Sequence, residues 1–183
     1  MTYILSNSKI KYVCAAVCSQ ISALNDRCLV KNMVCCFFGH KEVPSGLDKL
    51  LAPTLTELIA KGVDSFLVGN QGGFDSTVLH LLRKLKDKYP HITYNVVLAY
   101  MPGAKEEWSA YDPMETLYPE GLEAVHPRFA ISWRNKWMIQ EADVVVTYIT
   151  HSWGGAAQFA ELAERKKKRV INIASMMKSK TEK

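Results

Sequence analysis

The sequence predicts an α/β fold of three layers, a Rossmann-like domain in which helices flank a mostly parallel central sheet. From Met33 onward, short apolar runs alternate with longer runs of helical periodicity. Strands that are apolar throughout and separated by helices are typical of a parallel sheet covered on both faces. In addition, two glycine pairs, Gly72-Gly73 and Gly154-Gly155, each stand between a strand-like run and a helix-like run.

The first half of this pattern predicts three strands and two helices. The expected strands are 33–38, 63–68 and 92–100, and the expected helices are 47–61 and 74–89. In the first helix, Leu51, Leu55 and Leu58 fall on one apolar stripe. Gly62 follows that helix as a C-terminal stop, and Pro90 ends the second one.

The second half begins with a segment rich in proline and glycine, 101–127, which we expect to be a loop with one short strand at 115–118. The remaining expected elements are a helix at 128–142, a strand at 144–149, a helix at 154–167 and a strand at 169–173. Residues 1–32 show no clear period. We therefore expect an N-terminal extension of uncertain structure at 1–32, a domain at 33–175 and a disordered basic tail at 176–183.

Composition indicates a globular cytoplasmic protein with no membrane partner. Hydrophobic residues make up 48% and charged residues 22%, and no apolar run approaches the length of a membrane helix. The five cysteines are an odd number, which favours reduced thiols over a disulfide framework. Cys35 and Cys36 are neighbours in a strand and should point to opposite faces. The net charge of +5 is concentrated partly in the run 165–169, which fits a solvated helix end better than a nucleic-acid patch.

Loops that follow the expected strands carry the candidate ligand contacts. His40, the loop 69–73 and the loop 152–155 each come directly after a strand, so they should gather at one edge of the sheet. A glycine at the start of a helix lets an anion approach free N–H groups, and the helix dipole favours its charge. Two such turns predict an anionic ligand of nucleotide size. The alternative is that the glycines serve tight turns that need a positive φ.

Four motifs in the chain carry a family resemblance. They are Phe38-Gly39-His40-Lys41, Gly69-Asn70-Gln71-Gly72-Gly73-Phe74-Asp75, Arg134-Asn135-Lys136-Trp137-Met138 and Trp153-Gly154-Gly155. In this order, over roughly residues 33–175, the set resembles the YpsA-like branch of the SLOG superfamily. That superfamily has a Rossmann-like fold and includes the LOG nucleotide phosphoribohydrolases and the DNA-processing protein DprA. The resemblance implies a nucleotide or nucleotide-derived ligand at the carboxyl ends of the strands.

The candidate ligand-binding residues lie in these motifs and in the loop before the last glycine pair. They are Gly39, His40, Lys41, Gly69, Asn70, Gln71, Gly72, Gly73, Asp75, Arg134, Asn135, Ser152, Gly154 and Gly155. Arg134 leads this set, against the alternative of a surface arginine on an amphipathic helix. Lys41 stands where the family has arginine, which keeps the charge but loses the planar fork. Ser152 is expected to cap the following helix or to contact a phosphate.

This chain departs from the sequence pattern of the LOG enzymes after the last glycine pair. Their arginine, methionine and aspartate have the spacing of Arg134, Met138 and Asp143, and glutamates follow, one of which acts at the ribosyl bond. Here Ala157 and Gln158 stand where a carboxylate would be needed. Cleavage of an N-glycosidic bond needs a group that stabilises positive charge on the sugar or activates water. This departure argues against LOG-type hydrolysis.

Three functions follow, in decreasing order of support from the sequence. The first is a sensor or signalling module that binds a nucleotide derivative. The alternative is a nucleotide-processing enzyme, a LOG-like phosphoribohydrolase or another N-glycosidic or phosphate hydrolase, with Asp75, Glu42 or Glu115 as the acid or base. Single-stranded DNA binding, as in DprA, is the least favoured.

The expected partners are small molecules. The five histidines make no recognised ligand pair with each other or with cysteine, so no metal site is expected. Mg²⁺ would enter only as a bridge between Asp75 and a ligand phosphate. Trp108 and Tyr111, in the long loop, are candidates to cover a base. An apolar helix face would serve a homodimer, and the sequence leaves the oligomeric state open.

Overall fold

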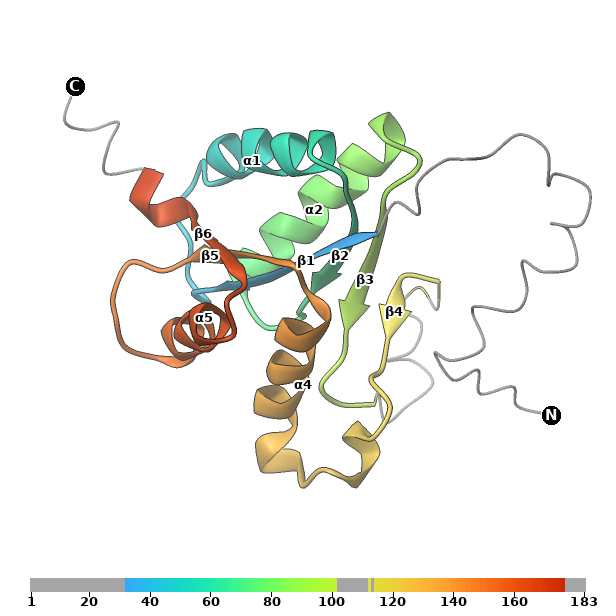
Figure 1. The fold of residues 1–183 in the computed structure, drawn as a ribbon, viewed down its shortest axis with the longest axis vertical. Helices are drawn as coiled ribbons and strands as arrows, with labels where there is room; N and C mark the ends of the chain where they lie inside the picture. The colour runs from blue at the N-terminus through green and yellow to red at the C-terminus, as the bar shows by residue number, and fades with distance from the viewer. Residues whose placement is uncertain (1–31, 102–111, 113, 177–183) are drawn as a thin grey trace, which may run out of the picture. The chain divides into compact units, whose positions relative to one another are not determined.

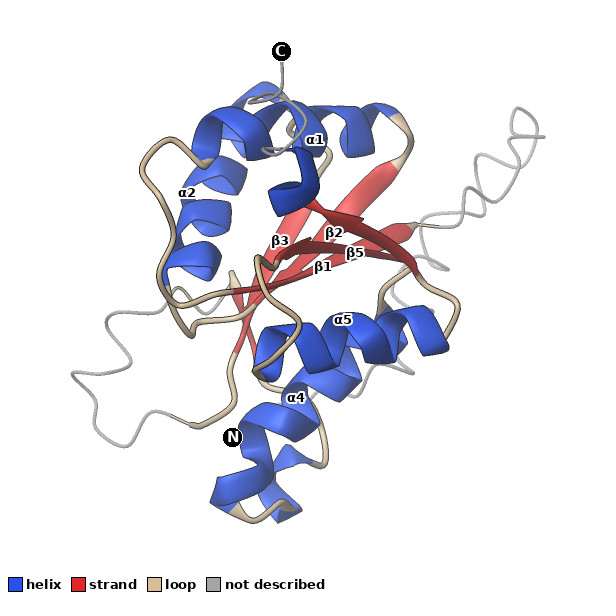
Figure 2. Ribbon diagram, turned by 90° about the vertical axis from the view of Figure 1, so that its left-hand side faces the viewer, coloured by secondary structure: helices blue, strands red, loops and turns tan. Residues whose placement is uncertain are grey.

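The computed structural model describes residues 32–101, 112 and 114–176, and within them it has an α/β fold. Six strands form one sheet in the order β4-β3-β2-β1-β5-β6. Every pair of neighbouring strands in it is parallel. Helices lie on both sides of the sheet (Figure 1, Figure 2), so the predicted three-layer arrangement is confirmed, with a sheet that is parallel throughout.

The elements follow the expected order along the chain. They are β1 (Met33–Gly39), α1 (Asp48–Ala60), β2 (Val63–Val68), α2 (Gly73–Lys88), β3 (Thr93–Val97), β4 (Thr116–Leu117), the 3-10 turn η2 (Leu122–Ala124), α4 (Pro127–Glu141), β5 (Val144–Tyr148), α5 (Gly155–Arg165) and β6 (Arg169–Asn172). The third strand is shorter than the expected 92–100. It ends at Val97, whose carbonyl oxygen accepts a hydrogen bond from Arg134 Nη1 at 2.8 Å.

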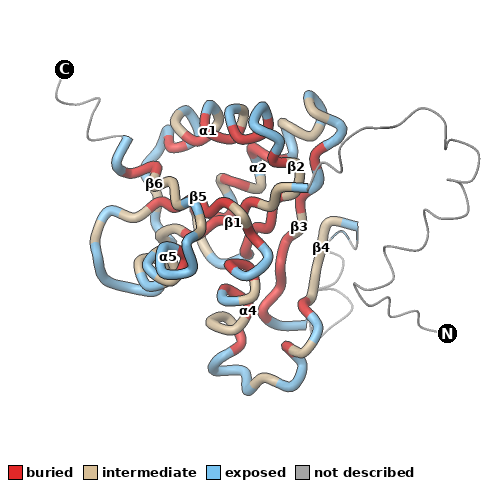
Figure 3. Tube along the Cα trace, in the orientation of Figure 1, coloured by how far each residue is buried: buried red, intermediate tan, exposed pale blue. Residues whose placement is uncertain are grey.

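Two apolar cores lie on the two faces of the sheet. The helices α1 and α2 cover one face, and α4 and α5 cover the other (Figure 2). Cys35 belongs to the first core and Cys36 to the second, which confirms that they point to opposite faces. Both are buried free thiols, and burial raises the pKa of each. Figure 3 shows buried residues running along the central strands between these layers.

The direction in which strands are added reverses at β1. This strand pairs with β2 on one side and with β5 on the other. Just beyond the strand, the His40 N–H donates to the Tyr148 carbonyl at 3.3 Å. In parallel sheets, the crevice at such a reversal, beyond the carboxyl ends of the strands, is where ligands bind. The fold therefore points to the region around Gly39 and the end of β5.

The end of β1 is packed directly against the start of α2. A Cβ atom added to Gly39 would lie 2.3 Å from Phe74 Cγ, and Phe74 is 1% exposed. This contact requires glycine because the ring occupies the space of a side chain. It ties the first strand to the glycine-rich turn.

Several sequence-based expectations lie outside the described residues. These are the structure of residues 1–31, the roles of Trp108 and Tyr111, and the disorder of residues 177–183. Among the residues that the structure does describe, no helix is both long and apolar enough to cross a membrane.

We expect Gly39→Ala to lower the free energy of unfolding by about 1–3 kcal/mol, the usual cost of overpacking a close contact. The measurement is urea unfolding followed by circular dichroism. Gly155→Ala is the matched control because a Cβ there meets nothing within 4 Å. Alanine is also the better helix former, by up to about 1 kcal/mol. Equal stability of Gly39→Ala and the wild type would contradict the packing described here.

Candidate functional site

A cleft of about 150 Å³ opens at the carboxyl end of β1, between α4 and α5. We call it the α4–α5 cleft. Its lining residues are Phe37, Phe38, Gly39, Gly69, Gln71, Asp75, Ile131, Arg134, Asn135, Gly155, Ala156 and Phe159. Every one of the four sequence motifs contributes to this lining. Residues far apart in the sequence are therefore brought to one place, at the reversal of strand order.

Arg134 is the cation of this cleft. It lies on α4 and is only 2% exposed. Its Nε donates to Asn135 Oδ1 at 2.9 Å, and its Nη1 donates to the Val97 carbonyl at 2.8 Å and to Asn70 Oδ1 at 3.3 Å. Burial lowers the pKa of Arg134, although an arginine remains protonated at neutral pH.

The charge of Arg134 has no ion-pair partner within the part of the chain that the structure describes. Its neighbours at hydrogen-bonding distance are neutral oxygens of Asn70, Val97 and Asn135. Arg134 Nη2 makes no hydrogen bond to the residues that the structure describes. It is also not one of the fully enclosed polar atoms that lack a partner, so it remains accessible. The guanidinium therefore keeps donors for a group in the cleft.

Asp75 is the nearest acidic group and lies in the first turn of α2. It is 9% exposed, and its Oδ2 accepts a hydrogen bond from the Gln71 N–H at 2.9 Å. Burial raises the pKa of Asp75 to about 6, against the opposing effects of that hydrogen bond and of the Arg134 charge. At pH 7 a carboxyl with this pKa is mostly ionised, so Asp75 attracts Arg134 through space, although the two make no direct ion pair among the described residues.

Gly69 allows Asp75 and Arg134 to approach the same point. A Cβ at this position would lie 2.5 Å from Asp75 Oδ2 and 3.2 Å from Arg134 Nη1. The glycine is required here by close approach of the two charged side chains. A larger residue would push them apart and fill the floor of the cleft.

The first glycine pair is covered by the protein itself. Gly72 has a φ of +117°, which fits the alternative that the pair serves a tight turn. The Gly73 N–H donates to the Lys41 carbonyl at 2.8 Å, and a Cβ on Gly73 would lie 2.7 Å from that oxygen. The expectation that this turn leaves its N–H groups free is therefore wrong for Gly73.

The second glycine pair is open. Gly154 has a φ of +95° and precedes α5, whereas a Cβ on Gly155 would meet nothing within 4 Å. Gly155 and Ala156 lie in the first turn, where N–H groups have no acceptor inside the helix. Within the described part of the chain these two N–H groups make no other hydrogen bond. Because both residues line the cleft, it has backbone donors as well as Arg134.

The other predicted ligand residues lie around this cleft. Lys41, Ser152 and Gly154 are exposed and do not line it. The expected cap by Ser152 is wrong, because the N-cap residue of α5 is Gly154 and no side chain caps the helix. His40 is at the mouth, where its Nε2 accepts a hydrogen bond from the Thr150 N–H at 3.0 Å. Its Nδ1 therefore carries the proton of the neutral ring.

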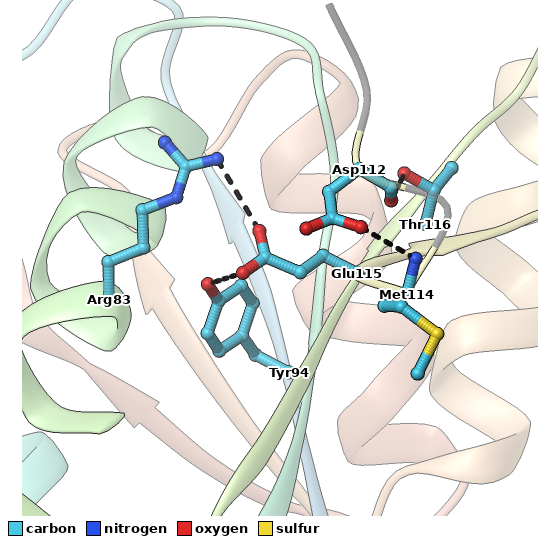
Figure 4. A network of polar contacts seen from close by, with 6 residues as sticks. All are labelled: Arg83, Tyr94, Asp112, Met114, Glu115 and Thr116. Carbon is cyan, nitrogen blue, oxygen red and sulfur yellow. Dashed lines mark hydrogen bonds and ion pairs between the residues drawn. The ribbon is translucent and has the colours of Figure 1, made fainter. Parts of the chain in front are cut away.

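A second cleft, of about 170 Å³, adjoins the first and shares Gly69 and Asp75 with it. We call it the acidic cleft because Asp75, Asp112 and Glu115 line it. Both carboxylate oxygens of Glu115 are engaged (Figure 4): one accepts from the Tyr94 hydroxyl, and the other pairs with Arg83 at 3.5 Å. Glu115 is therefore held in a network that leaves it little freedom to act as an acid or base.

The remaining acid–base candidates differ in position. Glu42 is exposed and lines neither cleft, whereas Asp75 lines both. Asp112 also lines the acidic cleft, and its Oδ1 accepts from the Met114 N–H at 2.8 Å (Figure 4). Among the described residues, no group of three or more histidine, cysteine, aspartate or glutamate side chains is arranged to hold a metal ion.

Sequence reasoning missed the apolar wall of the α4–α5 cleft. Ile131 lies three residues before Arg134 on α4, and Phe159 lies four residues after Gly155 on α5. Both spacings place a residue on the same helix face as its neighbour. Helical periodicity counted outward from Arg134 and Gly155 would have identified them.

Comparison with known proteins identifies no relative: no protein-family model matches the chain, and no curated protein matches it.

We expect the wild type to lose stability relative to Asp75→Asn as the pH rises from about 4 to 7. The folded pKa of about 6 lies above the ordinary 3.8, so folding favours the protonated form, and this contribution is lost as pH rises through about 6. A shift of this size corresponds to about 3 kcal/mol at most. Urea unfolding at a series of pH values measures the difference. Asp48→Asn, an exposed first-turn carboxylate of α1, is the control. A difference that is flat over this range would contradict the buried carboxyl.

Proposed function

We propose that this protein binds a nucleotide or nucleotide-derived ligand through a phosphate group in the α4–α5 cleft, as a sensor or signalling module. The observation that carries the proposal is the buried guanidinium of Arg134. It lines the cleft, has no ion-pair partner among the described residues and retains donors at Nη2.

A buried charge that makes no direct ion pair is costly for the fold, by several kcal/mol in the general case. An anion in the cleft would supply the missing partner and would be bound in surroundings where water screens the interaction weakly. Asp75 does not take this place, because it acts on Arg134 through space and makes no direct ion pair with it among the described residues. A phosphate suits the guanidinium better than a single acceptor does, since two of its oxygens can accept from one arginine.

The start of α5 supplies a second set of donors to the same anion. Gly155 and Ala156 line the cleft, and the dipole of α5 favours negative charge there by about 0.3–1 kcal/mol. Free N–H groups at a helix start are a recurrent way to bind phosphate. Arginine and helix N-terminus thus support the same ligand class from two sides of one cleft.

The resemblance to the SLOG superfamily agrees with this proposal. Its four motifs were chosen from the sequence alone, and each supplies a lining residue of the cleft, namely Gly39, Gly69, Arg134 and Gly155. A cleft of about 150 Å³ is smaller than the usual 300–1,000 Å³ of a small-molecule pocket. It would therefore hold the phosphate end of a nucleotide, with the rest of the ligand at its mouth.

Asp75 favours a second function, that of a nucleotide-processing enzyme. A carboxyl with a pKa of about 6, placed between two clefts, suits general acid or base catalysis near neutral pH. Incubation of the protein with nucleoside monophosphates tests this function. Released base that disappears in Asp75→Asn would support the enzyme, and the absence of product at high protein concentration would leave binding alone.

We expect Arg134→Gln to raise the Kd for ribose 5-phosphate and for AMP by at least about tenfold. A hydrogen bond to a charged group contributes about 1.5–3 kcal/mol, and the glutamine amide keeps a donor for Val97. Isothermal titration calorimetry measures the change. Arg128→Gln is the control because Arg128 is exposed on the same helix, α4. Equal affinities in the wild type and Arg134→Gln would place the ligand elsewhere.

A second variant tests the helix N-terminus without altering Arg134. We expect Ala156→Asp to abolish phosphate-ligand binding, because its carboxylate would occupy the anion site. The variant should fold, since an acidic residue in the first turn of a helix complements the dipole. A thermal shift assay measures both effects, because a ligand at 100 times its Kd stabilises a protein by about 2.7 kcal/mol. A full ligand-induced shift in Ala156→Asp would exclude this end of α5.

A further inference from the structure

We propose that a stack of three rings, His40, His151 and Trp153, is a platform for the base of the ligand, so that the ligand is a nucleotide with its base held outside the α4–α5 cleft. The inference rests on the proposed function and names the part of the ligand that the cleft does not hold. It assigns a binding role to Trp153, which is 72% exposed.

The three rings form a continuous stack. The centroids of His40 and His151 are 4.2 Å apart with an interplanar angle of 28°. Those of His151 and Trp153 are 3.9 Å apart at 13°. At the inner end, His40 meets the edge of Tyr148 at 6.0 Å and 81°. The stack therefore begins on a buried residue of β5 and ends on an exposed indole.

Hydrogen bonds hold the stack in place. The Thr150 N–H donates to His40 Nε2 at 3.0 Å, which fixes the first ring against the loop after β5. His151 Nδ1 lies 2.8 Å from the Trp153 carbonyl oxygen, and this contact holds the His151 ring against the backbone of Trp153. Burial and the neighbouring His151 lower the pKa of His40, so charge repulsion between the two imidazoles is avoided at neutral pH. The platform exists before a ligand arrives.

One face of the Trp153 indole is covered by His151, and most of the side chain remains in contact with solvent. A single exposed aromatic residue is common on protein surfaces and by itself indicates nothing. Here, however, the indole is held nearly parallel to its neighbour in a stack that begins in the core. Such an arrangement presents a flat apolar face, and every nucleobase has a flat face that stacks on aromatic rings.

The stack lies beside the proposed phosphate site. Trp153 precedes Gly155 by two residues and His40 directly follows Gly39, and both glycines line the α4–α5 cleft. Two residues of chain span at most about 7 Å. One sugar ring separates the base of a nucleotide from its phosphate. A ligand with its phosphate at Gly155 would therefore bring its base within reach of the stack, and the small volume of the cleft leaves the base outside.

The experiment compares AMP with ribose 5-phosphate, which has the same sugar and phosphate but no base. We expect Trp153→Ala to weaken AMP binding by between about fivefold and about 150-fold, the range that corresponds to stacking one base. The affinity for ribose 5-phosphate should be unchanged. Trp153→Phe should retain most of the AMP affinity. Isothermal titration calorimetry measures all three, with Phe129→Ala as the control because Phe129 is an exposed aromatic residue on α4.

A fluorescence measurement provides an independent readout. Stacking of adenine on an indole quenches its emission, so AMP should quench wild-type fluorescence and ribose 5-phosphate should not. The AMP-dependent part should be absent in Trp153→Phe. This variant keeps a ring in the loop, so the readout does not depend on loss of the fold.

The outcomes separate the stack from the phosphate site. If the wild type binds both compounds and Trp153→Ala changes neither affinity, the base platform is wrong and the phosphate site stands. If the wild type binds neither compound, the proposed function and this inference both fail. If Trp153→Ala leaves AMP affinity intact but shifts the sedimentation coefficient, the indole is a contact between copies of the chain, and the inference is overturned.

Discussion

The guanidinium of Arg134 is the interaction on which the candidate site depends. Its hydrogen bonds to Val97 and Asn70 tie α4 to the carboxyl ends of β3 and β2, across the sheet from α2, the helix that follows β2. The same group places a positive charge in a cleft without an ion-pair partner among the described residues. One side chain therefore serves the fold and also carries the proposed binding. An anion in the cleft would relieve an electrostatic cost that the hydrogen-bonded oxygens and the through-space effect of Asp75 offset only in part.

The carboxyl group of Asp75 acts electrostatically on the charge of Arg134, and burial raises the pKa of Asp75. Gly69 lets it approach the point that Arg134 also reaches. A fully ionised Asp75 would compete with a ligand phosphate for the guanidinium. Because Asp75 makes no direct ion pair with Arg134 among the described residues, it competes less than a carboxylate in contact with the guanidinium would. Together with Gly69, Asp75 lines both the α4–α5 cleft and the acidic cleft.

Local periodicity was sufficient to predict the long strands and helices, because buried parallel strands and amphipathic helices differ in the spacing of their apolar residues. It did not predict η2, which lies in the segment that we expected to be a loop with one short strand. The end of β3 was not predictable in this way. The carbonyl oxygen of Val97 accepts a hydrogen bond from Arg134, a residue far along the chain. The candidate residues were found because glycines follow the strand ends and because Arg134, on α4, lies in a motif of the family resemblance. Their individual roles depended on tertiary contacts, as when Phe74 fills the space beside Gly39. The stack of His40, His151 and Trp153 could not be recognised in the sequence, because its rings come together only when β1 and β5 pair.

The two glycine pairs are alike in sequence and different in the fold, and topology explains the difference. The connection from β1 to α1 passes over the start of α2 because both helices cover the same face of the sheet. Lys41, in that connection, then takes the N–H of Gly73. The helix α5 follows β5, beyond the reversal of strand order, and covers the opposite face. The β1–α1 connection does not reach its first turn, so Gly155 stays open. The reversal at β1 thus decides which helix start is left open.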